Sequence, residues 1–225
     1  MERLLMSQDP VDDVLVPDLI VPSRTVGYTK GHETREMILR SALGILIEEG
    51  WQAMSMRRIA ASCGIKFGNL TYHYRTREEL VRELLEAVIS AYEREFETTV
   101  YQSGLTPEQR LERYCSLVLE DIQSKKTTRL FPELWALSNH DQFVHDRMHE
   151  LYARARAPIN DIVALMRPDL QQKDCDDLSL FISFSMEGST VFAGYAKPFL
   201  SSMPQIKRIS IKSFINIVNT YVPEI

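Results

Sequence analysis

The stretch from Ser55 to Leu80, SMRRIAASCGIKFGNLTYHYRTREEL, constrains the fold more than any other part of the sequence. Ser55 is a typical helix N-cap, and apolar residues follow it at the three- and four-residue spacing of one buried helix face. Gly64 ends this segment, because glycine adopts the left-handed backbone that a tight turn between helices requires. Thr76, with Glu79 three residues later, forms a capping box. The stretch therefore predicts two short helices joined by a turn, followed by a longer helix.

The second short helix, expected from Lys66 to His73, has a polar and aromatic outward face. Only Leu70, with Phe67 or Tyr74, is needed on its inward face. Short polar side chains suit base edges in a DNA major groove, and Lys, Tyr and His suit phosphate oxygens. The expected DNA contacts in this region of the chain are Arg35, Ser55, Arg57, Lys66, Phe67, Gly68, Asn69, Thr71, Tyr72, His73 and Arg77.

The order IA..CGI..GNLTYHYRTREEL resembles the DNA-binding signature of the tetracycline-repressor (TetR/AcrR) family of bacterial transcription regulators. That family shows a Gly-Val-Ser-x-Gly-x-Leu-Tyr-x-His-Phe run followed by a Ser-Lys-Glu-x-Leu helix start. The matching positions are Ile59, Ala60, Gly64, Ile65, Gly68, Leu70, His73, Tyr74, Thr76, Arg77, Glu78 and Leu80. Lys66 replaces a small hydroxyl residue, and Thr71 stands where the family has a phosphate-contacting Tyr. Tyr72 is the candidate for that contact here.

Positive charge is concentrated in the same region. The formal net charge of the chain is −5, which does not by itself indicate nucleic-acid binding. Residues 1–23 hold one base against five acids, residues 24–82 hold ten against six, and residues 83–225 hold fifteen against twenty. The basic segment is the one that contains the two short helices, and clustered bases are what phosphate binding requires.

The rest of the sequence predicts further helices and no strand. They are expected at about 34–49, 76–100, 107–122, 130–138, 141–166, 174–195 and 206–222, with residues 125–129 as a polar connection. We therefore expect an all-α fold of about nine helices.

Three regions are expected along the chain. Residues 1–30 form a flexible arm, residues 31–82 a three-helix DNA-binding domain, and residues 83–225 a helical bundle. Two interpretations of the arm stay open: a solvated tail, or a basic segment that reaches the minor groove through Arg24 and Lys30.

The resemblance implies that the second domain binds an inducer and forms a dimer. Its bulky side chains at helical spacing form either an ordinary core or the wall of a mostly apolar pocket. Glu187 lies in an apolar run, where a buried acid needs a neighbouring group, a ligand amine or water as partner. The expected pocket residues are Phe131, Trp135, His140, Met148, Tyr152, Phe184 and Glu187, with Glu133 as a further polar candidate.

A dimer is expected because one helix-turn-helix makes few base contacts, whereas two can read successive major grooves about 34 Å apart. The last two long helices, near 178–195 and 206–222, are the candidates for the interface. The expected interface residues are Phe184, Gly188, Val191, Phe214, Ile217 and Val218.

The sequence also contains features that bear on other functions. His145 and His149 share a helix face, with His140 upstream, and could make a metal-responsive regulator; a polar helix face is the simpler explanation. No Gly-rich phosphate loop, Gly-x-Ser-x-Gly elbow or Cys-x-x-Cys pair occurs, so neither an enzyme nor a cofactor is expected. A helical scaffold that does not bind DNA is the remaining alternative.

The location is expected to be the cytoplasm. Cys63, Cys115 and Cys175 are scattered, which suits a reducing compartment, although a redox sensor stays open. No apolar run approaches the ~20 residues of a membrane span, and the first residues do not resemble a secretion signal. The sequence predicts a homodimeric regulator, most simply a repressor, that an unidentified small molecule releases from double-stranded operator DNA.

Overall fold

The computed structural model describes residues 19–21 and 29–223, and in these residues it contains helices and no strand. The elements are α1 (Thr29–Glu49), η1 (Trp51–Ala53), α2 (Met56–Ser62), α3 (Phe67–His73), α4 (Arg77–Thr99), α5 (Pro107–Asp121), α6 (Lys125–Ser138), α7 (Gln142–Met166), α8 (Gln172–Glu187), α9 (Ser189–Ala193), η2 (Leu200–Ser202) and α10 (Met203–Thr220). The prediction of an all-α fold is confirmed. Within the described ranges, no helix combines the length and the apolar character needed to cross a bilayer.

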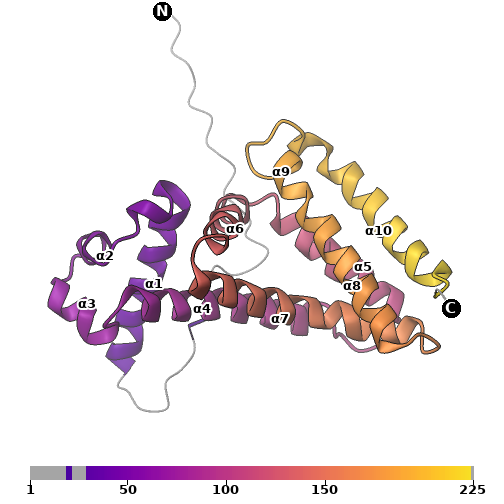
Figure 1. Ribbon diagram of the computed structural model, residues 1–225, viewed down its shortest axis with the longest axis horizontal. Helices are drawn as coiled ribbons and strands as arrows, with labels where there is room; N and C mark the ends of the chain where they lie inside the picture. Colours follow the sequence, from indigo (N-terminus) through magenta and orange to yellow (C-terminus); the bar gives the residue numbers. More distant parts are fainter. Residues whose placement is uncertain (1–18, 22–28, 224–225) are drawn as a thin grey trace, which may run out of the picture.

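The first three helices form a small unit at one end of the molecule (Figure 1). α1 packs against α2, and α2 packs against α3. Ile38 of α1, Ile59 of α2 and Leu70 of α3 have no exposed surface, and Trp51 of η1 is buried as well. These apolar residues form the core that holds α3 at the surface of the unit.

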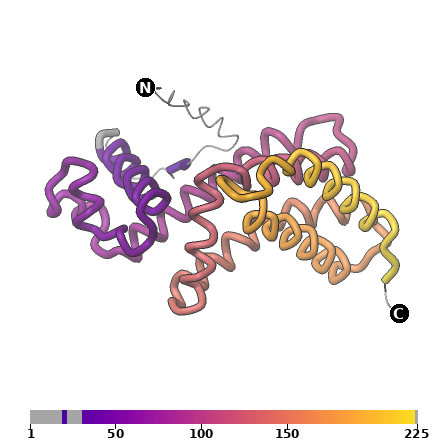
Figure 2. Tube along the Cα trace, turned by 90° about the horizontal axis from the view of Figure 1, so that it is seen from above, coloured from indigo at the N-terminus to yellow at the C-terminus, as the bar shows by residue number. Residues whose placement is uncertain are grey.

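α4 leaves this unit and enters a second bundle, where it runs alongside α7 (Figure 1). α7 also packs against α5, α6 and α8, while α10 covers α5 (Figure 2). Val144, Ile159, Ile162 and Val163 of α7 have no exposed surface. α7 is therefore the central helix of the second bundle.

Two helices differ from the sequence-based expectation. Residues 125–129 were predicted to be a polar connection, but they form the start of α6, and the Ser124 hydroxyl caps it by accepting the N–H of Thr127 at 3.1 Å. The helix expected over residues 174–195 is interrupted at Gly188, after which the five-residue α9 begins.

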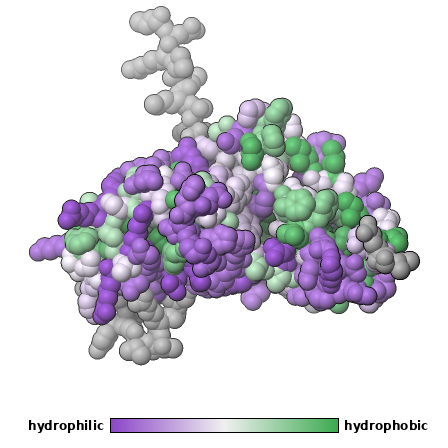
Figure 3. All heavy atoms as spheres, viewed as in Figure 1, coloured by the Kyte–Doolittle hydropathy of each residue, from purple (hydrophilic) through white to green (hydrophobic). Residues whose placement is uncertain are grey.

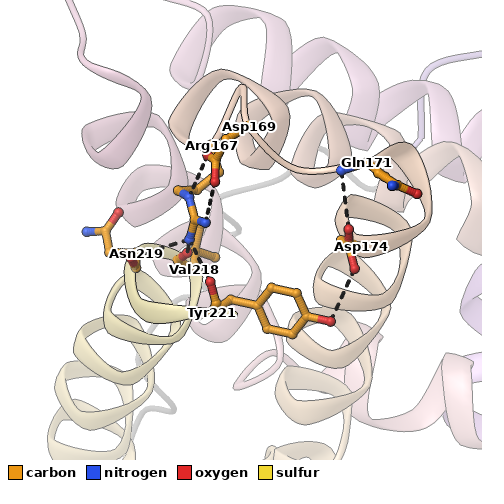
Figure 4. A network of polar contacts seen from close by, with 7 residues as sticks. All are labelled: Arg167, Asp169, Gln171, Asp174, Val218, Asn219 and Tyr221. Atoms are coloured by element: carbon orange, nitrogen blue, oxygen red, sulfur yellow. Dashed lines mark hydrogen bonds and ion pairs between the residues drawn. The ribbon is translucent and has the colours of Figure 1, made fainter. Parts of the chain in front are cut away.

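Arg167, at the end of α7, fixes the C-terminal end of α10 (Figure 4). Its Nη1 donates hydrogen bonds to the main-chain oxygens of Val218 at 2.9 Å and Tyr221 at 3.0 Å, and its Nη2 pairs with Asp169 at 2.6 Å. The last carbonyls of a helix lack partners within that helix, and a basic side chain satisfies them. The Tyr221 hydroxyl donates to Asp174 at 3.3 Å, which joins α10 to α8.

Residues 19–21 belong to the segment that we expected to be a flexible arm. Leu19 is buried, and the main-chain N–H of Ile20 donates to the oxygen of Ala87 in α4 at 2.9 Å. These three residues are therefore packed on α4. The proposed minor-groove residue Arg24 and the side chain of Lys30 lie outside the described residues.

Candidate DNA-binding surface and ligand pocket

A tight turn sets the angle between the two short helices. The Ser55 hydroxyl accepts the main-chain N–H of Arg58 at 3.2 Å, which caps α2 as predicted. Gly64 has a φ of 66°, a left-handed conformation that favours glycine. The N–H of Ile65 then returns to the oxygen of Ala60 at 3.1 Å, and α3 starts after Lys66. The predicted cap, turn and helix are all present.

α3 has one buried side and one open side. Leu70 and the following Tyr74 have no exposed surface, and they hold the helix against the unit. Tyr72, in contrast, is 83% exposed and Phe67 is 46% exposed. Lys66, Gly68 and Asn69 are exposed too, and Thr71 and His73 are half-buried at the edge of the open side. All seven predicted contacts on and beside α3 therefore lie on one accessible surface.

Basic side chains flank this open side. Arg57 of α2 is exposed, and its guanidinium lies 5.9 Å from the ring centroid of Phe67; Ser55 is exposed nearby at the cap. Arg75, which follows α3, is exposed. It was not among the predicted contacts, although the sequence shows a basic residue soon after the helix. Arg58 is exposed, but it pairs with Glu49 at 2.5 Å.

Two predicted DNA contacts need correction. Arg35 is only 5% exposed, and its guanidinium pairs with Glu83 of α4. Arg77 lies over the ring of Trp51, 4.1 Å from the centroid, and donates to the Trp51 oxygen at 2.8 Å. Both guanidinium groups hold the first unit to α4 and do not belong to the open surface of α3.

α6 connects the second bundle to the first unit. Lys125 pairs with Glu48 of α1 at 2.6 Å, and Arg129 Nη1 donates to the oxygen of Ile47 at 3.1 Å. Glu133, predicted to be a pocket residue, instead accepts the N–H of Trp51 at 3.3 Å. The first two and a half turns of α6 are thus bound to the end of α1 and to η1.

The opposite side of α6 lines a pocket in the second bundle. The cavity has a volume of about 40 Å³, which is room for a few water molecules. Its lining residues come from α4 to α8 and are Ile89, Tyr92, Phe96, Tyr114, Val118, Asp121, Ile122, Thr127, Phe131, Leu151, Tyr152, Ala155, Ser183, Met186 and Glu187. The pocket is mostly apolar, with few polar groups, as is usual for small-molecule sites.

Three of the seven predicted pocket residues, Phe131, Tyr152 and Glu187, line this cavity. Trp135 does not line the cavity itself, but its indole N–H donates to the hydroxyl of the lining residue Tyr152 at 2.8 Å. The other three predicted residues do not line the cavity. His140 is exposed after the end of α6, and Phe184 is 57% exposed on α8. Met148 packs against the hydrophobic core outside the cavity. The α4 and α5 residues of the lining were missed because their pattern is that of ordinary core.

Two carboxylates give the pocket its polarity. Asp121 is buried; the hydroxyls of Tyr92 and Thr127 donate to its Oδ2, and Lys126 Nζ lies 3.6 Å from its Oδ1. Glu187 is half-buried, and its Oε2 atom is buried without a hydrogen-bond partner in the described structure. Burial raises the pKa of Glu187 to about 7, with Asp121 adding to the effect and a hydrogen bond from Tyr152 opposing it.

An exposed apolar surface covers α8 and α9. Its members are Leu180, Phe181, Phe184, Val191 and Phe192, each 37% to 62% exposed. Figure 3 shows hydrophobic residues gathered over the part of the molecule where α8, α9 and α10 lie. Phe184 and Val191 of the predicted interface belong here, Gly188 is exposed between α8 and α9, and Ile217 is half-buried. Phe214 and Val218 are corrected, because both are buried within the single chain.

The ring centroids of His145 and His149 are 4.3 Å apart, but no group of three or more potential metal ligands occurs in the described part of the chain.

Cys115 and Cys175 are buried and Cys63 is half-buried, all as free thiols. Burial raises the pKa of the Cys115 thiol, which disfavours the reactive thiolate.

Two family models match the chain. Residues 38–84 match bacterial regulatory proteins of the tetR family, and residues 107–203 match the C-terminal domain of BetI-type transcriptional repressors. The two matches together cover more than half of the chain. No curated protein matches it.

Solved structures share the fold. A TetR transcription regulator from Haloarcula marismortui is 16% identical, with a TM-score of 0.69 over 82% of this chain and 97% of that chain. The ketosteroid transcriptional regulator of Mycobacterium tuberculosis is 22% identical, with a TM-score of 0.56 over 86% and 97%. A protein from Saccharomonospora viridis, solved in complex with choline, is 16% identical, with a TM-score of 0.64 over 86% and 100%.

At these sequence identities the solved structures show only that the fold is shared. The family models show which family the chain belongs to. The matched residues 38–84 contain the α2–turn–α3 unit with its open, basic and aromatic side. The chain therefore belongs to the TetR family of bacterial regulatory proteins and is a DNA-binding transcriptional regulator.

Proposed function

We propose that the protein is a homodimeric repressor that leaves its operator when a small molecule occupies the pocket of the second bundle. The observation that carries this proposal is the position of α6. One side of this helix lines the pocket through Thr127 and Phe131, and its other side binds α1 and η1 through Lys125 and Glu133. A ligand that moves α6 therefore acts directly on the unit that carries α3.

On the DNA side, α3 enters a major groove. Asn69 and Thr71 contact base edges, because their short polar side chains match the donors and acceptors found there. His73 contacts a phosphate oxygen. Lys66 and Tyr72 contact phosphate oxygens, and Arg57 and Arg75 support them from either side of the groove. Gly68 has no side chain and allows close approach of the helix backbone.

The dimer forms through the exposed apolar surface of α8 and α9. A contiguous surface of this kind is typical of an interface between protein chains. A second copy of the chain covers it and places the two α3 helices at the spacing of successive grooves.

The choline complex of the similar Saccharomonospora viridis protein supports a small-molecule effector for this chain.

The coupling between pocket and DNA is limited by the effector itself. An effector shifts the equilibrium only by the difference between its affinities for the DNA-binding and released arrangements, typically about 1–3 kcal/mol. The small pocket belongs to the DNA-binding arrangement, and a ligand that separates the helices around it favours the released arrangement.

Selection from a library of random-sequence duplexes tests the DNA-binding part of this proposal. We expect the selected duplexes to share two inverted half-sites, and affinity to fall steeply with salt because phosphate binding releases counterions. A shuffled duplex of the same composition is the control. Recovery of no common sequence, or equal affinity for the shuffled duplex, would point to a helical scaffold instead.

A further inference from the structure

Leu19, Ile20 and Val21 precede the first helix, yet they are attached to the folded part of the chain. Leu19 is only 4% exposed, and Ile20 and Val21 are half-buried against the same hydrophobic core. The main-chain N–H of Ile20 donates to the oxygen of Ala87 in α4 at 2.9 Å. Residues ahead of the first helix of a domain are usually ordered only where other contacts hold them. Side chains and main chain both supply such contacts here.

The attachment lies where α4 passes from the first unit into the second bundle (Figure 1). Glu83, which pairs with Arg35 of α1, is four residues before Ala87. Residues four apart lie on the same face of a helix, one turn from each other. α1 and residues 19–21 therefore bind successive turns on one face of α4, at the junction of the two parts of the molecule.

The covalent chain joins the same three residues to the start of α1. Residues 22–28 connect Val21 to Thr29, the first residue of α1. An extended chain spans at most about 3.5 Å per residue, so Val21 and Thr29 are at most about 28 Å apart. A rotation of the first unit that carries Thr29 beyond this distance has to pull Leu19 out of the core.

The chemistry of the three residues suits a firm attachment. They carry no charge, and Pro22 restricts Val21 to extended backbone, which keeps this segment out of α1. Fully burying one leucine shifts an equilibrium between two arrangements by about 10- to 100-fold. Coupling between two sites in one protein is typically about 5- to 150-fold, so an attachment of this strength is large enough to decide between two orientations.

We propose that residues 19–21 act as a clamp that fixes the orientation of the first unit relative to the second bundle and thereby sets the half-site spacing that the dimer accepts. The orientation concerns the single chain. The spacing rests on the proposed function, because it requires two α3 helices on one duplex. The clamp precedes residue 38 and lies outside both regions that match family models, so membership of the family does not imply it.

Two deletions isolate the clamp. A chain that starts at Leu19 after an initiating Met keeps the clamp, and a chain that starts at Pro22 lacks it. Both chains keep Arg24 and Lys30, so a minor-groove contact of those residues does not distinguish them. The two proteins differ in three residues, and any difference in their behaviour belongs to the clamp.

A distance between spin labels tests the orientation. Asn69→Cys places one label on the exposed side of α3, and Leu165→Cys places the other on an exposed position near the end of α7. Cys63→Ser removes the half-buried thiol, and an excess of unlabelled protein removes distances between chains. We expect a narrow distance distribution in the chain that starts at Leu19 and a broader one in the chain that starts at Pro22. Equal widths would overturn the proposal.

Operator duplexes of altered length test the spacing. One base pair inserted between the half-sites moves the second half-site by about 3.4 Å along the axis and about 35° around it. We expect the ratio of dissociation constants, inserted duplex against operator, to be about tenfold smaller without the clamp. Both constants are measured on one preparation, so a loss of folded protein cancels. Equal ratios for the two deletions, or a ratio that already falls in the chain that starts at Leu19, would contradict the spacing role.

Two substitutions in the full chain repeat the comparison without a deletion. Leu19→Asp puts a charge in a buried position and should reproduce both effects of removing the clamp. Leu19→Met keeps the apolar volume and should behave as wild type. Thermal unfolding checks that each variant is folded. A folded Leu19→Asp variant with the narrow distribution and the wild-type ratio would refute the clamp.

The label distances and the DNA titrations separate this inference from the proposed function. Wild-type protein that binds every duplex equally contradicts the proposed function, while the label distances still decide whether the clamp fixes the orientation. Specific operator binding with a width that depends on the clamp supports both. Specific operator binding with the same width in both deletions overturns the clamp alone.

Discussion

Tyr72 is the most exposed large hydrophobic side chain in the described part of the protein, while Leu70, two residues earlier, is completely buried. Tyr72→Ala should therefore weaken operator binding by about 1–3 kcal/mol and leave the free energy of unfolding within about 0.5 kcal/mol of wild type. Fluorescence anisotropy with labelled operator and thermal denaturation measure the two quantities. Tyr72→Phe removes only the hydroxyl and isolates its hydrogen bond to phosphate. Loss of stability in Tyr72→Ala would show a structural role.

Lys66 is exposed at the N-terminal end of α3, where a phosphate contact is expected. Lys66→Ala should weaken binding to operator and to unrelated duplex by similar factors. In a dimer two contacts are lost, so the slope of log affinity against log salt should become shallower by about 2, at about 0.9 for each phosphate. An unchanged slope, measured between 50 and 200 mM salt in the same buffer, would exclude the phosphate contact.

Glu187 makes stability depend on pH. Its pKa rises from 4.5 to about 7 on folding, so the folded protein holds a proton that the unfolded chain has lost in this range. The favourable contribution is present below pH 4.5 and is lost as pH rises through about 7, to a total of about 3 kcal/mol. Urea denaturation at pH 5 and pH 8 should show this loss in wild type relative to Glu187→Gln. Parallel pH profiles for the two proteins would contradict it.

Single residues were predictable from the sequence where their role is local. Leu70 and Tyr72 follow from the period of one helix, and Ser55 and Gly64 from the chemistry of caps and turns. Arg35 was misassigned because its partner, Glu83, is 48 residues away, and a charge in the sequence does not reveal whether it meets solvent or a distant carboxylate. Tertiary contacts of this kind have no period in the sequence.

At the scale of elements, α9 approaches α6 closely at Gly194. A Cβ atom added there would lie 2.6 Å from the Thr128 hydroxyl and 2.7 Å from the Thr190 main-chain oxygen. Gly194→Ala should therefore destabilise the fold by about 1–3 kcal/mol, as measured by urea denaturation.

Gly44 is the control for this substitution. It lies within α1, and an added Cβ would have no atom within 4 Å apart from its chain neighbours and the nearby backbone of its own helix. Gly44→Ala should stabilise by up to about 1 kcal/mol through helix propensity. Equal effects of the two substitutions would mean that the close contact at Gly194 does not limit the packing of α9 against α6.

The start of α6 shows why one helix boundary was wrong. Lys126, Thr127 and Thr128 are polar residues in sequence, but all three are buried, and their partners, Asp121 and the oxygen of Ile122, lie on the preceding turn. Sequence periodicity recognises a helix by its apolar stripe. A helix whose first turn buries hydrogen-bonded polar groups does not show that stripe, so residues 125–129 resembled a connection.

At the scale of the whole molecule, the proposed dimer forms through the exposed apolar surface of α8 and α9. Phe184→Glu places a charge on this surface, where Phe184 is 57% exposed in the single chain, and should convert a dimer to monomers in sedimentation experiments. Met37→Glu introduces the same change on α1, far in sequence from this surface, and should leave the dimer intact. A wild-type protein that sediments as a monomer at all concentrations would contradict the interface.

Under the proposed function, the small volume of the cavity determines the order of events on a promoter. The cavity has room for only a few water molecules, so in the proposed mechanism this structure is the DNA-binding arrangement and needs no further signal to hold its operator. Because linkage is reciprocal, operator-bound protein resists opening, and the concentration that clears a promoter exceeds the one that half-saturates free protein. Genes controlled in this way respond late, after the protein molecules that are not bound to DNA have bound the effector.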